Sequence, residues 1–82
     1  MRNVVVTGGG TGIGYEVARR FAEAGERVVI VGRRRAVLER AAVELGENVS
    51  TLVCDLADPD AVEHALDSLP ATVDVLVNNA GS

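Results

Sequence analysis

The chain has 82 residues, 48% hydrophobic residues and a formal net charge of −4, so it can form one domain and is too apolar to be an intrinsically disordered segment. The negative charge gives no reason to expect nucleic acid or an anionic membrane as a partner, and no apolar run approaches the length of a membrane span. A single cysteine, Cys54, excludes an internal disulfide, and the N-terminus shows no export signal, so we expect a cytoplasmic protein.

Short apolar runs alternate with helical patterns from the N-terminus onward. The β-branched run 4–6 predicts a first strand, which a glycine cluster ends. Apolar residues at helical spacing then predict a helix over residues 13–24, with Gly25 as its stop. Residues 27–31, of which 28–31 form a continuous apolar run, predict a strand that is buried on both faces, and Gly32 ends it.

The same alternation continues to the end of the chain. Apolar positions from 37 to 45 predict a second helix, with Gly46 as its stop. Residues 49–54 predict a third strand. A third helix is expected over residues 58–70, because the segment opens with Asp-Pro, a capping residue followed by the residue favoured at the first helical position. Residues 73–77 predict a fourth strand.

This β-α-β-α-β-α-β order predicts an α/β fold of the Rossmann type, a doubly wound parallel sheet that spans residues 1–82 as part of a single domain. The chain has one Tyr, one Phe and no Trp, so we expect a core of Val, Leu, Ile and Ala. Ligands of such sheets bind beyond the carboxyl ends of the strands. The glycine cluster and the Asn-Asn-Ala-Gly tail both follow strands, and they therefore predict one binding crevice.

The segment 7–14, Thr-Gly-Gly-Gly-Thr-Gly-Ile-Gly, lies between a predicted strand and a predicted helix. Glycines let the backbone turn tightly and approach a ligand, and the helix N-terminus offers N–H groups to a negative pyrophosphate. A flexible loop is the alternative, but the strand, loop and helix context favours a dinucleotide site. The residues of this loop predicted to contact a cofactor are Gly8, Gly10, Thr11, Gly12, Ile13 and Gly14.

The pattern Thr7-Gly-x-x-x-Gly12-x-Gly14 resembles the glycine motif of the short-chain dehydrogenases/reductases. Asn-Asn-Ala-Gly after the fourth strand resembles the second marker of that family, and Asp55-Leu56 follows the third strand, so the resemblance covers essentially the whole chain. It implies an oxidoreductase that interconverts a carbonyl and an alcohol, of which this chain supplies the cofactor-binding half.

The resemblance also implies roles for single residues. Asp55 would accept a hydrogen bond from the adenine amino group, although capping or turn formation is the structural alternative, and Leu56 would line the adenine pocket. Asn79 would tie the fourth strand to Thr7, and Asn78 would lie near the cofactor ribose. Two small residues would let the cofactor pass closely, namely Ala80 and Gly81.

The end of the second strand indicates which dinucleotide binds. An acidic residue there bonds the ribose 2′-hydroxyl of NAD, whereas arginine accommodates the 2′-phosphate of NADP. Gly32 holds the acidic position and three arginines follow it, so NADP(H) is favoured, with Arg33 as the first choice and Arg34 as the second. NAD(H) remains the alternative, because Thr11 stands where many NADP-dependent members carry a basic residue. A solvated cationic face is the structural alternative.

The remaining polar residues suggest no further chemistry. Tyr15 is followed four residues later by Arg19 rather than Lys, unlike the family's catalytic Tyr-x-x-x-Lys, so a packing or solvent-facing role is expected. His64 lacks neighbours at metal-ligand spacing and should lie on the surface, and no metal site is predicted. Cys54 reads as a small buried hydrophobe.

No catalytic residue is predicted within this chain. The family's serine, tyrosine and lysine follow the Asn-Asn-Ala-Gly marker, hence lie beyond Ser82, and the chain contains no lysine. We therefore expect the leading part of a longer protein, which would act on a small-molecule carbonyl or alcohol as a homo-oligomer. The alternative is a non-catalytic dinucleotide-binding module or half of a split assembly, and a methyltransferase fold is a distant third.

Overall fold

The computed structural model describes residues 1–79, which form a four-stranded parallel sheet in the order β3-β2-β1-β4. The bounds of the elements are β1 Asn3–Thr7, α1 Gly12–Glu23, β2 Arg27–Gly32, α2 Arg35–Leu45, β3 Val49–Val53, α3 Pro59–Leu66 and β4 Val75–Asn78. The chain moves outward from β1 to β3 and then returns to pair β4 with the other side of β1. The predicted α/β Rossmann-type sheet is confirmed, and its strand order reverses between β1 and β4.

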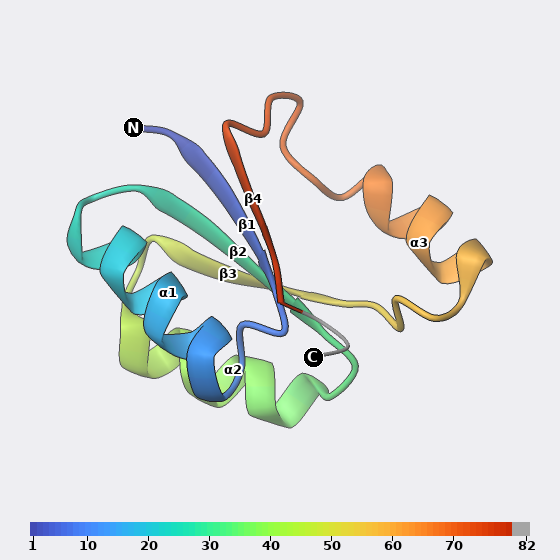
Figure 1. Ribbon diagram of the computed structural model, residues 1–82, viewed down its shortest axis with the longest axis horizontal. Helices are drawn as coiled ribbons and strands as arrows, with labels where there is room; N and C mark the ends of the chain where they lie inside the picture. The colour runs from blue at the N-terminus through green and yellow to red at the C-terminus, as the bar shows by residue number, and fades with distance from the viewer. Residues whose placement is uncertain (80–82) are drawn as a thin grey trace.

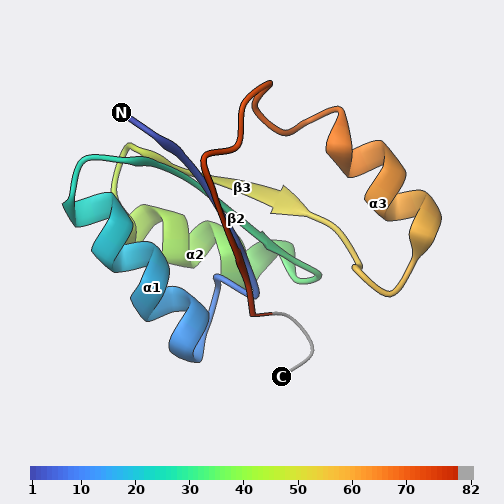
Figure 2. The ribbon, with the colours of Figure 1, turned by 45° about the horizontal axis from the view of Figure 1, so that its top comes forward.

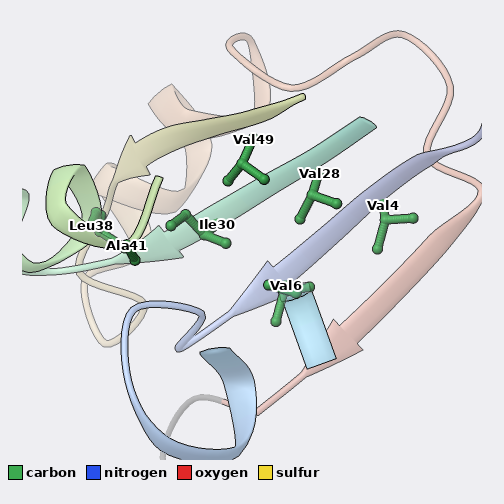
Figure 3. Close-up of a cluster of buried hydrophobic side chains, with 8 residues drawn as sticks. Val4, Val6, Val28, Ile30, Leu38, Ala41 and Val49 are labelled. Atoms are coloured by element: carbon green, nitrogen blue, oxygen red, sulfur yellow. The ribbon is translucent and has the colours of Figure 1, made fainter. Parts of the chain in front are cut away.

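The two faces of the sheet are covered by different helices (Figure 1). Helices α1 and α2 lie on one face, and their apolar sides enclose the larger core, whose buried residues are shown in Figure 3. As the composition predicted, these residues are aliphatic: Val4, Val6, Ala18, Val28, Ile30, Leu38, Ala41 and Val49. Burying each of the larger side chains stabilises the fold by about 1.5–3 kcal/mol, so this core anchors the strand ends that carry the site.

The second face carries a smaller core. Its buried residues are Val5, Val31 and Cys54, and α3 adds only partly buried side chains to them. Figures 1 and 2 both place α3 apart from the other two helices, beyond β3. Leu76 of β4 faces this side, since it is the register partner of Val5, and it remains 64% exposed. This face of the sheet is therefore only partly covered.

Two predicted boundaries are wrong. Helix α3 ends at Leu66 instead of Pro70, because the proline ring has no N–H and would collide with the carbonyl of residue 66 in a continued helix. After α3, the backbone hydrogen bonds span three residues instead of four, such as the bond from the Ser68 N–H to the Ala65 carbonyl (2.9 Å).

Strand β4 begins at Val75 instead of Val73. The carboxylate of Asp74 accepts a hydrogen bond from the N–H of Asn3 (2.7 Å), and the N–H of Asp74 donates to the carbonyl of Asn3 (2.8 Å). The Asp74 carboxylate thus occupies the Asn3 N–H, which a longer pairing of β1 with β4 would use. Asp74 therefore holds the start of β1 and does not extend β4.

Candidate functional site

A cleft of about 610 Å³ opens at the carboxyl ends of β1, β2 and β3. The glycine loop, the first turn of α2 and the segment after β3 form its walls. Seven of the predicted site residues line it, namely Gly8, Gly10, Thr11, Arg33, Arg34, Asp55 and Leu56. Three chain segments that are distant in sequence therefore meet in one cavity, as the alternation of strands and helices requires.

The glycine loop is shaped by backbone conformations and contacts that exclude side chains. Gly8 and Gly12 have φ angles of +68° and +58°, in the left-handed region that favours glycine. A Cβ atom at Gly14 would lie 2.1 Å from the carbonyl oxygen of Gly8, so the first turn of α1 packs directly on the loop backbone. The loop thus brings main-chain atoms, rather than side chains, to the cleft.

Two helices begin at this cleft without a side-chain cap. Thr11 precedes α1 and Arg34 precedes α2, and in the described part of the chain neither side chain accepts a bond from its own helix. By contrast, the Asp58 carboxylate caps α3 by accepting the N–H of Asp60 (3.0 Å). The unpaired N–H groups and positive dipole ends of α1 and α2 are therefore suited to an anion.

The arginines of the cleft lie directly after β2. Arg33 and Arg34 are both exposed, and within residues 1–79 neither forms an ion pair, whereas Arg35 lies 3.9 Å from Glu39 along α2. Cations near a helix N-terminus are disfavoured by its dipole. An anionic ligand between the two guanidinium groups and the start of α2 would relieve this unfavourable arrangement.

The opposite wall of the cleft is formed by the residues after β3. One oxygen of the Asp55 carboxylate accepts the N–H of Ala57 (3.0 Å), which is the turn-forming role considered from the sequence. Leu56 is 39% exposed at the cleft wall. The adenine contacts of both residues stay predictions.

Sequence reasoning missed five residues of the lining, namely Val31, Val37, Leu38, Cys54 and Ala57. Gly32, which the sequence placed at the position that distinguishes NAD from NADP, lines the cleft as well. Cys54 is buried, as predicted, but it also faces the cavity. Position could have identified Cys54, since it directly follows β3, and the carboxyl ends of such strands form ligand sites.

Other predicted site residues lie outside the lining. The start of α1 (Gly12, Ile13 and Gly14) is adjacent to the loop but does not line the cleft. Ile13 was also expected on the apolar stripe of its helix, and this is wrong, since its side chain is 75% exposed. The buried residues of α1 are Gly14 and Ala18, and the side chain of Ile13 lies outside that buried side of the helix. The predicted Ala80 and Gly81 lie outside the described residues.

Thr7 joins the ends of β1 and β4. Its hydroxyl accepts the backbone N–H of Asn79 (2.9 Å) and lies within donating distance of the Val77 carbonyl (3.3 Å) and the Asn78 side-chain oxygen (3.2 Å). The tie expected between Asn79 and Thr7 is present, and its donor is the main chain. Asn78 and Asn79 do not line the cleft, so their contacts to a cofactor stay predictions.

Tyr15 has the packing role expected of it. It is half-buried against the larger core, and its hydroxyl donates to the Glu44 carboxylate (2.8 Å), which joins α1 to α2 and raises the pKa of Tyr15. His64 is exposed on α3. No cluster of His, Cys, Asp and Glu among residues 1–79 could hold a metal ion. Across the same described range, no helix is long and apolar enough to cross a membrane.

Comparison with known proteins decides the family. The model of the family described as "short chain dehydrogenase" matches residues 2–82. The chain belongs to the short-chain dehydrogenase family. It is 48% identical to the "NADP-dependent 3-hydroxy acid dehydrogenase YdfG" of Salmonella typhi, over 95% of this chain and 33% of that protein. It is 43% identical to "Serine 3-dehydrogenase" of Agrobacterium fabrum, again over 95% of this chain and 32% of the relative.

Solved structures agree with this assignment. A "short chain dehydrogenase/reductase family protein" superposes with a TM-score of 0.93 at 43% identity, over 99% of this chain and 34% of that one. A serine dehydrogenase complexed with NADP+ superposes with a TM-score of 0.89 at 41% identity, over 96% and 33% of the two chains. The chain spans about a third of the length of the relatives it matches.

Proposed function

We propose that this chain is the cofactor-binding half of an NADP(H)-dependent oxidoreductase that interconverts a carbonyl and an alcohol in a small molecule. The observation that carries the proposal is the cleft in which the glycine loop, Arg33, Arg34 and the Asp55-Leu56 segment meet. A bound nicotinamide dinucleotide would supply or accept the hydride. In this proposal, residues 1–82 bind the dinucleotide.

The residues present fit such a cofactor. Close backbone packing between Gly8 and Gly14 and the two uncapped helix starts favour a pyrophosphate at the glycine loop. Asp55 and Leu56, on the opposite wall, are assigned to adenine. The proposal assigns Arg33, with Arg34 as the second choice, to the 2′-phosphate, because a guanidinium pairs with phosphate through a planar fork of donors.

The names of the relatives support NADP over NAD. The Salmonella relative is named NADP-dependent, the serine dehydrogenase was solved with NADP+, and an actinorhodin polyketide ketoreductase of the same fold was solved with NADPH. These relatives are named for different substrates, namely 3-hydroxy acids, serine and a polyketide. The proposal therefore stops at the class of small-molecule alcohols and carbonyls.

The test of this function is cofactor titration of the protein as its gene encodes it. We expect NADPH to bind more tightly than NADH, and Arg33→Ala to weaken NADPH binding by about 1.5–3 kcal/mol, roughly 10- to 150-fold, with little effect on NADH. Arg40→Ala is the matched control, because Arg40 is an exposed arginine of α2 that does not line the cleft. Equal losses for NADPH and NADH, or an equal effect of the control, would contradict the assignment.

A further inference from the structure

We propose that Tyr15 is a positioning residue for the cofactor, because its hydrogen bond to Glu44 joins α1 to α2 and holds the first turn of α1, to which the pyrophosphate is assigned. The inference rests on the proposed function, since it concerns how the same cleft binds its dinucleotide. It gives Tyr15 a part in binding, although Tyr15 does not line the cleft.

The first turn of α1 has no capping side chain of its own. Thr11 precedes the helix and lines the cleft, and in the part of the chain that the structure describes its hydroxyl accepts no bond from the N–H groups that follow. A capping side chain would occupy an N–H group of the helix start, where the pyrophosphate is assigned. The turn is therefore open to a ligand, and contacts from elsewhere in the fold must fix its position.

Tyr15 makes such a contact. Its backbone N–H donates to the Thr11 carbonyl (3.2 Å), a bond that belongs to the first turn of α1. The side chain of Tyr15 packs against the larger core, and its hydroxyl donates to the Glu44 carboxylate of α2 (2.8 Å). Figures 1 and 2 both show α1 and α2 on the same face of the sheet. Tyr15 thus connects a residue of the cleft lining to the last turn of the neighbouring helix.

The position of Glu44 makes this bond valuable to α2 as well. Glu44 lies in the last turn of α2, where the helix dipole disfavours a carboxylate. No basic residue shares that turn, and no ion pair within residues 1–79 includes Glu44. The hydrogen bond to Glu44 raises the pKa of Tyr15, so the hydroxyl keeps the proton that it donates. The bond therefore offsets an unfavourable carboxylate position and favours one arrangement of α1 against α2.

Titration of the protein as its gene encodes it with NADPH, NADH and adenosine 2′-phosphate tests the proposal. Tyr15→Phe keeps the ring and removes the hydroxyl, so it should weaken NADPH and NADH binding equally, by about three- to tenfold. Adenosine 2′-phosphate has no pyrophosphate, and its affinity should not change. Unchanged NADPH binding, or an equal loss for all three probes, would overturn the positioning role.

The acceptor provides matched variants. Glu44→Gln keeps an oxygen that can accept the tyrosine O–H and should bind NADPH as the unmutated protein does, whereas Glu44→Ala should lose as much affinity as Tyr15→Phe. The double variant Tyr15→Phe with Glu44→Ala should lose no more than either alone, because both changes remove the same bond. Additive losses would contradict the pair.

Glu47→Ala is the control for the removed charge. Glu47 lies just beyond α2 and forms no hydrogen bond or ion pair through its side chain within the described range 1–79. It should bind NADPH as the unmutated protein does, and a loss equal to that of Glu44→Ala would contradict the role of the hydrogen bond.

Hydrogen exchange of the free protein separates this inference from the proposed function. Without the hydroxyl, the amide of residue 15 should exchange faster while thermal unfolding changes little, because the first turn of α1 opens locally. This measurement needs no cofactor. Failure of the unmutated protein to bind either dinucleotide would contradict the proposed function, whereas unchanged exchange at residue 15 in Tyr15→Phe would contradict the role of Tyr15 itself.

Discussion

The glycines at positions 12 and 14 meet two different physical constraints in the same loop. Gly12 has a φ of +58°, and a Cβ atom there would meet nothing within 4 Å. Gly14 has no such positive φ, but a Cβ atom there would overlap the Gly8 carbonyl oxygen and lie 2.8 Å from Nδ2 of Asn79. The first position needs a left-handed backbone, and the second needs the absence of a side chain.

This distinction leads to a prediction for stability. Gly14→Ala should destabilise the fold by about 1–3 kcal/mol, because the backbone of the loop must shift to admit a methyl group. Gly12→Asn should cost less, since asparagine is among the residues that adopt the left-handed conformation and the space around it is open. Denaturant unfolding of the two variants provides the comparison. A smaller loss for Gly14→Ala than for Gly12→Asn would contradict the packing argument.

At the scale of elements, the hydroxyl group of Thr7 adds a side-chain link between β1 and the residue that follows β4, beyond the last pair of the β1–β4 ladder. Thr7 is 8% exposed, and it is the only buried polar residue among those that the structure describes. Its bond from the Asn79 N–H fixes the Asn-Asn segment beside the glycine loop, at the point where the strand order reverses. The link therefore positions a sequence motif that does not itself line the cleft.

Thr7→Val should remove this link while keeping the shape of the side chain. We expect a loss of about 1–3 kcal/mol in the free energy of unfolding, because the Asn79 N–H loses this acceptor, together with faster hydrogen exchange at that amide. Thr51→Val in β3 is the matched control, since no hydrogen bond of the Thr51 hydroxyl occurs within residues 1–79. Unchanged exchange at Asn79 would argue against the link.

The elements themselves follow from local patterns, and the cleft follows only in part. Apolar periodicity and the glycines that stop helices predicted all seven elements, because these signals depend on neighbours in the chain. Periodicity placed Leu38 on the apolar side of α2, but its position in the cleft lining beside Gly10 and Gly32 depends on how α2 crosses the sheet. The proline predicted the end of α3 at Pro70, but the helix already ends at Leu66, and the clamp by Asp74 required tertiary structure.

At the scale of the whole molecule, the two faces of the sheet are covered unequally. Helices α1 and α2 enclose the larger core, while α3 contributes no fully buried residue to the other face. Leu76 on that face is 64% exposed, and β4 is an outer strand of the sheet that residues 1–79 form. An exposed apolar side chain on an outer strand favours association with other chains.

Residues 1–82 prepared by themselves should therefore self-associate through this face. Leu76→Thr should weaken that association roughly tenfold, since burying a leucine contributes about 1.5–3 kcal/mol and threonine keeps the preference for a strand. Val43→Thr is the control, because Val43 is more exposed (83%) but lies on α2, away from β4. Sedimentation velocity over a concentration series measures both variants. Monomeric behaviour of the unmutated segment, or an equal effect of Val43→Thr, would show that the uncovered face of the sheet does not drive association.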